Sequence, residues 1–491
     1  MSDVLFTNVR IFDGGGEAPF TGDVLVQGNR ISRVTKTGYG QRTPPVMGAQ
    51  QIDGAGAFLM PGMVEAHTHF SWNDQPSLDA IQRMPPEEHI LWCAEVAKRY
   101  LDMGWTSCVG AATAKPRLDV VIRNAINDGT IQGPRYLAAS QEITVPGGLG
   151  DTTAPHLPQP EFAFGAVVSG AEEMRRCVRM FAKYGVDTLK INLSGESITG
   201  MPSDMSQFTA EEIRVCVEEA HAWGKRVAAH ARSTWSIKEC VRQGIEVIYH
   251  ASFADEEALD MLEAKKFEHF VAPGLAWLIN TVHNASAWGL TPEVVKKMDY
   301  PRELDAAIGS MRAMRKRGIR ILPGGDYGFA WTPHGTNAKD LEYFVKHVGM
   351  STMEALLSAT AWGGPMMKMG KQLGYIREGC LADILLIDGD PLADITVLQD
   401  KARILAVMKD GEFHRAPPLR QQRSTATTRW AAPRTAASPK RAAAPSSRRR
   451  WLWRCQYPTR CARRLRCGSN RSASRRDRRG CVPMRRADRS M

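Results

Sequence analysis

Strand-like and helix-like segments alternate eight times in the middle of this chain of 491 residues, which limits the folds that it can adopt. The strand-like segments are short apolar runs at 63–70, 106–112, 135–140, 187–193, 226–231, 246–252, 269–275 and 320–326. Alternating strands and helices predict an α/β fold with parallel strands, and eight repeats predict a (β/α)8 TIM barrel. One helical stretch begins near Thr209, with Glu212 three residues later, which predicts a capping box.

Strand patterns of another kind stand on both sides of this region. Short alternating runs, separated by Gly, Asn and Asp, lie at 4–14, 23–34, 382–390 and 403–411. Such alternation is typical of hairpin strands. We therefore expect residues 1–60 and 370–415 to form one small β-sandwich domain, with the barrel of residues 61–369 inserted between its two parts.

Six polar residues stand at the ends of the predicted barrel strands. They are His67, His69, Lys190, His230, His250 and Asp326. A barrel of this kind displays its catalytic groups at one end of its strands, so the six side chains would converge there. His67 and His69 project from the same face of a strand and can hold one ion. A single histidine is more commonly a core residue, but the ordered set predicts a metal site.

Lys190 needs a chemical explanation, because an ammonium group has no lone pair and cannot ligate a cation. Reaction with CO2 would convert Lys190 into a carbamate whose oxygens can bridge two metal ions, and such ions make hydroxide available near neutral pH. Asp326, as the catalytic residue, would then take the proton of the attacking hydroxide and pass it to the leaving nitrogen. The alternative is that Lys190 is a strand-end lysine that reaches solvent.

These residues resemble the amidohydrolase superfamily. Within it they are similar to the binuclear branch of imidazolonepropionase-like and Xaa-Pro dipeptidase-like enzymes, and aryl urea and carbamate hydrolases are also related. The resemblance covers about residues 1–415 and rests on a set of motifs. They are PGMVEAHTH (61–69), DTLKINLSG (187–195), AAHAR (228–232), IYHAS (248–252), GGDYG (324–328), HGTNAKDLE (334–342) and ADILLIDGDPLADI (382–395).

The resemblance implies a role for each of the six strand-end residues: His67, His69 and Asp326 hold one ion, His230 and His250 hold the second, and carboxylated Lys190 bridges both. It also implies that the ions are zinc, that the chain forms a homo-oligomer, and that it hydrolyses an amide-type C–N bond other than an ordinary peptide bond. Deaminases of the same superfamily use one ion and lack the bridging lysine, so Lys190 favours two ions.

One motif departs from the family. Dipeptidase-like and mycotoxin-cleaving relatives usually carry Gly-Gly-His-Gly-Asp after the third strand, and here Leu149 takes the place of that histidine. The change favours an apolar or aromatic amide, urea or carbamate over a substrate with a free carboxylate. A dipeptide or an N-acyl amino acid is the alternative. The residues expected to contact the substrate are Trp72, Leu149, His283, Tyr327 and His334, with Phe70 and Phe329 as further aromatic wall.

Residues 416–491 have a composition unlike the rest of the chain. They contain 21 Arg and 1 Lys against 2 Asp, a net charge of +20, which leaves −8 for residues 1–415 because the whole chain carries +12. Arg, Ala, Pro and Ser without periodicity predict a disordered basic tail. Its four cysteines are unlike a basic arm, and we hypothesise a frameshift artefact. The alternative function of the chain is nucleic-acid binding through this tail.

The expected location of the protein is the cytoplasm. The chain has no apolar run of about 18 residues, and its N-terminus lacks the basic and apolar segments of a signal peptide. The six cysteines of residues 1–415 have no CxxC spacing, and we expect them to be reduced. We expect a small-molecule substrate, and neither a membrane nor a nucleic acid as partner.

Overall fold

The computed structural model describes residues 3–38 and 43–418, and the predicted basic tail lies outside these residues from position 419 onward. Helices alternate with parallel strands through the centre of the described chain, so the predicted α/β class is confirmed. Within the described ranges, no helix combines the length and the apolar character needed to cross a membrane.

Two parallel sheets form the centre of the fold. The first contains β6 (Met63–Thr68), β7 (Trp105–Gly110) and β8 (Arg135–Leu137). The second has the order β10-β9-β11-β14-β15-β16, with β9 (Ala139–Thr144), β10 (Gly165–Val167), β11 (Thr188–Asn192), β14 (Arg226–Ala231), β15 (Val247–His250) and β16 (Phe270–Ala272). Every side chain of β6, β7, β9, β11 and β14 is buried, as expected for parallel strands that are covered on both faces.

Two of the predicted strands differ from the observed ones. The run 135–140 divides into β8 and β9. In residues 320–326 the strand pairing shrinks to one parallel bridge, between Ile321 and Val271. Pro323 interrupts this run because proline has no backbone N–H to donate to a neighbouring strand.

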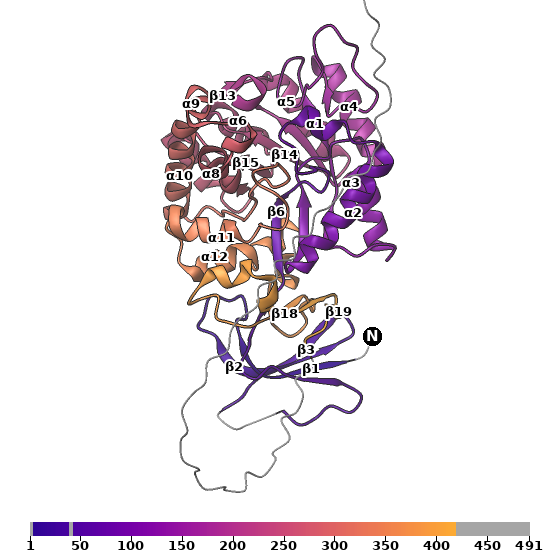
Figure 1. Ribbon diagram of the computed structural model, residues 1–491, viewed down its shortest axis with the longest axis vertical. Coiled ribbons are helices and arrows are strands. Elements are labelled where there is room, and N and C mark those ends of the chain that lie inside the picture. Colours follow the sequence, from indigo (N-terminus) through magenta and orange to yellow (C-terminus); the bar gives the residue numbers. More distant parts are fainter. Residues whose placement is uncertain (1–2, 39–42, 419–491) are drawn as a thin grey trace, which may run out of the picture. The chain divides into compact units, whose positions relative to one another are not determined.

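Thirteen α-helices follow and flank these strands in the described residues. They are α1 (Leu78–Gln82), α2 (Pro86–Asp102), α3 (Leu118–Asn127), α4 (Ala171–Tyr184), α5 (Ala210–Ala222), α6 (Thr234–Gln243), α7 (Glu256–Ala264), α8 (Leu275–Asn284), α9 (Pro292–Lys297), α10 (Tyr300–Lys316), α11 (Lys339–Tyr343), α12 (Thr352–Ala359) and α13 (Gly363–Met366). Figure 1 shows β6, β14 and β15 among these helices. The predicted capping box is present at the start of α5, where the Thr209 and Glu212 side chains each accept a hydrogen bond from the other residue's backbone N–H.

A short hairpin follows β11 and was not predicted. Its strands are β12 (Ser194–Glu196) and β13 (Met201–Ser206), which pair antiparallel, and the 3-10 turn η1 (Ser197–Thr199) joins them. The hairpin thus extends the chain from the carboxyl end of β11, which is the end where the predicted site residues stand.

A third sheet combines strands from both ends of residues 1–415. Its path is β19-β18-β17-β5-β1-β2-β3, and β4 pairs with β1 beside this path. The strands are β1 (Val4–Ile11), β2 (Phe20–Gln27), β3 (Arg30–Lys36), β4 (Gln50–Asp53), β5 (Phe58–Pro61), β17 (Ile384–Ile387), β18 (Ile404–Lys409) and β19 (Glu412–Arg415). In Figure 1, β1, β2, β3, β18 and β19 lie together. The sandwich form of this domain and its boundaries at 60 and 370 stay predictions.

Candidate metal centre

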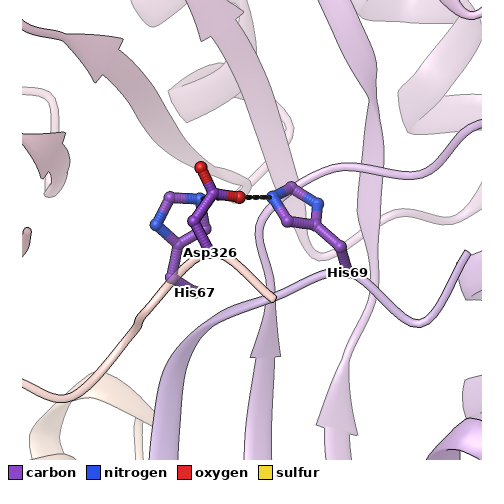
Figure 2. Close-up of side chains that lie close together, drawn as sticks. All are labelled: His67, His69 and Asp326. Atoms are coloured by element: carbon purple, nitrogen blue, oxygen red, sulfur yellow. Dashed lines mark ion pairs between the residues drawn. The ribbon is translucent and has the colours of Figure 1, made fainter. Parts of the chain in front are cut away.

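Three of the six predicted ligands form a tight group. Nε2 of His67 lies 3.6 Å from Oδ1 of Asp326, and Nε2 of His69 lies 3.2 Å from the same oxygen. One donor atom from each of the three residues lies within 4.8 Å of the others. Figure 2 shows the Asp326 carboxylate directed at the His69 ring, with the His67 ring beside it. Two imidazoles and a carboxylate at this spacing can hold one divalent cation.

The other three predicted ligands lie at the same place. The ring centroids of His230 and His250 are 4.4 Å apart, and those of His67 and His250 are 5.2 Å apart. Lys190 comes from the neighbouring strand β11, next to β14, which carries His230. All six strand-end residues line one cavity. The structure therefore brings the whole predicted set together.

The histidines of this cavity are suited to hold a cation. Burial lowers the pKa of His67, His230 and His250 well below the usual histidine value, so their rings are neutral and keep a lone pair. The Nδ1 atoms of His67 and His250 are buried, and no described residue offers them a hydrogen bond. Nδ1 of His69 contacts the Ala112 carbonyl oxygen at 3.0 Å, which leaves Nε2 of that ring for an ion.

Lys190 does not reach solvent, because its side chain is only 2% exposed. Its Nζ lies 3.6 Å from Oε1 of Glu142 and 5.1 Å from the centre of the Tyr249 ring. Burial lowers the pKa of Lys190, although the Glu142 carboxylate opposes this effect. A lower pKa favours the neutral amine, which is the form of a lysine that reacts with CO2.

The backbone is strained at two of the predicted ligands. Asp326 has φ 62° and His250 has φ 72°, in the left-handed region that residues other than glycine rarely adopt. Strain of this kind gathers at functional sites, where the surrounding structure maintains it. Burial by itself would raise the pKa of Asp326, but His67 and His69 hold it below its usual range, so this carboxylate is ionised.

The rest of the cavity wall is largely apolar. Its aromatic and aliphatic side chains are Trp72, Leu78, Leu149, Ile198, Trp277 and Phe329. The Trp72 ring stacks on His69, with 3.7 Å between the ring centroids. Three residues that the sequence predicts to contact a substrate, Trp72, Leu149 and Phe329, are thus in a position to do so.

The structure places the other predicted substrate contacts away from the lining of this cavity. His283 is exposed near the end of α8. His334 is buried behind Trp72, with Nε2 2.8 Å from the Trp72 carbonyl oxygen. The Tyr327 hydroxyl donates to the Asn337 carbonyl at 3.2 Å, and Phe70 stacks on Tyr136. His334 supports the Trp72 backbone, and a substrate contact for these four residues stays a prediction.

Sequence reasoning missed two acidic residues that line the cavity, Glu142 and Glu196. The carboxyl of Glu196 lies 2.6 Å from the guanidinium of Arg232, and Arg232 lies 2.5 Å from the Glu303 carboxyl. Burial raises the pKa of Glu196 to about 7, although the charge of Arg232 opposes this shift. Arg232 is the last residue of the AAHAR motif, so the sequence did point to this arginine. No motif in the sequence marks either glutamate.

Comparison with known proteins adds independent findings. Residues 58–413 match the model of the amidohydrolase family. Ochratoxinase from Aspergillus niger is 28% identical over 380 residues, which cover 73% of this chain and 76% of the relative. The crystal structure of a Xaa-Pro dipeptidase with bound methionine in the active site matches with TM-score 0.75 and 27% identity, over 84% of this chain and 100% of that structure. The crystal structure of A. niger ochratoxinase matches with TM-score 0.72 and 25% identity, over 84% and 96% of the two chains.

Proposed function

Because this chain belongs to the amidohydrolase family, we propose that it is a metal-dependent hydrolase that cleaves an amide, carbamate or urea C–N bond in a small aromatic or apolar substrate. One observation carries the proposal. The six strand-end residues converge on a single cavity whose remaining wall is mostly apolar. A few polar groups in an apolar cavity are typical of small-molecule sites.

The ligand set supports two divalent ions, which we take to be zinc. His67, His69 and Asp326 would hold one ion, His230 and His250 the other, and Lys190 would bridge both after carboxylation. When bound, such a pair of ions makes hydroxide available near neutral pH and polarises the bond to be cleaved. Zinc as the metal, a homo-oligomeric state and a cytoplasmic location stay predictions from the sequence.

In the proposed reaction, Asp326 transfers the proton, and aromatic side chains of the cavity wall position the substrate. Asp326 is ionised, and its Oδ1 lies between two imidazoles, so it can take the proton of the attacking nucleophile. The same oxygen then gives the proton to the leaving nitrogen. Trp72 and Trp277 form part of the wall that would hold an aromatic group and exclude water from the reacting bond.

We also propose that the two parallel sheets close into one (β/α)8 barrel. Three contacts between the strand segments support closure. The Thr113 N–H donates to the Ser140 carbonyl at 3.0 Å, Ile321 bridges to Val271, and the Ala66 N–H donates to the Pro323 carbonyl at 2.9 Å. Closure would place all six predicted ligands at the carboxyl end of one barrel.

A dipeptide or an N-acyl amino acid is the second candidate substrate. The 27% identity to a Xaa-Pro dipeptidase favours it. Leu149 lines the cavity where dipeptidase-like relatives usually carry a histidine, and it provides no polar side chain for a substrate carboxylate. Nucleic-acid binding through the tail is an alternative function of the chain, but it would leave the cavity without a role.

The test uses the full-length chain loaded with zinc. Aryl amides, aryl ureas, carbamates, N-acyl amino acids and dipeptides are compared by kcat/KM. We expect hydrolysis in one of the first three classes, loss of activity with a chelator, and a fall in kcat of about 10²- to 10⁴-fold in Asp326→Asn. His221→Gln changes a partly exposed residue on α5 and should leave kcat unchanged. Turnover that resists the chelator, or that is confined to dipeptides, would contradict the proposal.

A further inference from the structure

Glu196 is an acidic residue of the cavity wall that the proposed reaction does not use. It ends β12, and the next turn, η1, supplies Ile198 and Thr199 to the same wall. Glu196 lines the cavity and is only 5% exposed, so its carboxyl lies in a largely dry environment. A buried carboxyl beside a substrate cavity interacts strongly with any charge or N–H group of the ligand.

The position of this carboxyl is fixed by two neighbours. The Tyr300 hydroxyl donates to Oε1 of Glu196 at 2.7 Å, and the Arg232 guanidinium lies 2.6 Å from Oε2. The Tyr300 oxygen in turn accepts from the Ile198 N–H at 2.9 Å. An ionised carboxylate can accept about four hydrogen bonds. Glu196 is therefore held in place and still has acceptor capacity for a ligand.

Arg232 does not provide a free positive charge for the ligand. It is fully buried, and it lies between two glutamates because its NH1 is 2.5 Å from Oε1 of Glu303. Even if Glu196 carries a proton, Glu303 balances the charge of Arg232. In both protonation states of Glu196, this cluster has no surplus positive charge.

The other cation of the wall is also paired. Lys190 lies 3.6 Å from Glu142, and it would carry a negative charge once carboxylated. Among the described residues that line the cavity, Lys190 is the only lysine, it has an acidic partner, and there is no arginine. A carboxylate on the distal part of a substrate would find no basic partner there, whereas an N–H donor would find Glu196.

We propose that Glu196 is a specificity residue that binds an N–H or ammonium group on the substrate and disfavours a carboxylate at that position. The inference rests on the proposed hydrolase function and narrows its substrate class. Amides, ureas and carbamates that carry a further N–H or amine group would be preferred over acidic analogues of the same size.

The test compares three acetanilides that differ in one ring substituent: aminomethyl, carboxamide or carboxylate, each in the meta and para series. For the zinc-loaded full-length chain, we expect kcat/KM for the aminomethyl and carboxamide compounds to exceed that for the carboxylate by about tenfold or more, because a like charge beside a buried carboxyl is costly. The difference should lie mainly in KM, since the substituent is remote from the bond that is cleaved. A wild-type preference for the carboxylate compound overturns the proposal.

The variant Glu196→Gln keeps the size of the side chain and removes its charge. We expect the discrimination to fall by about tenfold, while kcat for the carboxamide compound changes little. The matched control is Glu219→Gln, which alters a buried glutamate on α5 that pairs with Arg179 at 2.7 Å and does not line the cavity. Equal discrimination in wild type and Glu196→Gln contradicts a role for Glu196.

Failure of the hydrolase proposal can be separated from failure of this one. If the enzyme cleaves none of the anilides, their dissociation constants for the zinc-loaded chain are measured directly by calorimetry. We then expect the aminomethyl and carboxamide compounds to bind more tightly than the carboxylate compound. Absence of turnover then counts against the hydrolase, and a reversed order of binding counts against Glu196. The preference of the wild-type chain among the three anilides tests the proposal even if Glu196→Gln does not fold.

Discussion

The proposed two-ion site requires Lys190, because carboxylated Lys190 would be the ligand that both ions share. Its side chain is buried, which makes a charged ammonium costly to maintain, although a carboxylate and an aromatic ring lie beside it. Carboxylation would replace this amine by an anion at the centre of a histidine cluster. The proposed two-ion site therefore depends on Lys190 more than on any single imidazole.

Lys190→Ala should lower the metal content from about two ions per chain to less than one, because the bridging ligand is removed. Turnover should be lost together with the metal. Plasma mass spectrometry of the purified, zinc-loaded protein measures the content, and an added short carboxylate such as acetate should restore part of it. Lys238→Ala, on α6 and paired with Asp255, is the control. Stoichiometric zinc in the Lys190 variant would refute the bridging role.

The sequence predicts the convergence of the six ligands but not the groups around them. His67 and Asp326 could be placed because each ends a strand-like run, and the fold brings such ends together. Glu196 could not be placed, since no apolar run leads directly to it and its partner Arg232 comes from a distant segment, just after β14. His334 was expected at the substrate, but the orientation of its ring is set by the Trp72 carbonyl, a contact that spacing cannot reveal.

At the scale of elements, the strands of the two parallel sheets that could be predicted are buried ones. Their apolar runs mark β6, β7, β11 and β14, whose side chains are all buried. The hairpin of β12 and β13 escaped prediction because β12 has only three residues, none of them a large apolar one, and β13 is partly exposed, so no apolar run marks either strand. The eighth predicted strand departs from regular pairing for another reason. At Pro323 and Gly324 the backbone comes very close to β6 and does not form a regular ladder of hydrogen bonds with it.

Gly324 permits this approach, and Gly324→Ala should disturb both the fold and the site. A Cβ at position 324 would lie 2.6 Å from the Cβ of His67 and 3.0 Å from that of Ala272, so β6 must shift. We expect a loss of about 1–3 kcal/mol in the free energy of unfolding, measured with urea, together with weaker zinc binding. The control Gly309→Ala lies in α10, where an added Cβ meets no heavy atom within 4 Å, and it should stabilise by up to about 1 kcal/mol. Equal unfolding midpoints for the two variants would contradict this account.

At the scale of the whole molecule, ion pairs among the described residues connect the parallel strands to the mixed sheet. Arg135 of β8 lies 2.6 Å from Asp383 and 2.5 Å from Asp410, which stand beside β17 and β18, so a partly buried charge cluster connects the parallel strands to the mixed sheet. The last strand, β19, ends at Arg415, and the match to the family model ends at residue 413. The family fold therefore requires no residue of the basic tail.

Deleting residues 416–491 should leave catalysis intact, because the cavity and the sheets are built from earlier residues. The deletion removes a charge of +20 and leaves a body of −8, so any nonspecific, salt-sensitive binding of nucleic acid should disappear with it. We expect an unchanged kcat/KM and a melting temperature within about 2 °C of the full-length value. If the truncated chain no longer hydrolyses the substrate, the tail contributes to the enzyme, and the frameshift hypothesis is wrong. Hydrolysis retained by a truncated chain that no longer binds nucleic acid would separate the two functions, and would place the chemistry in the acidic body.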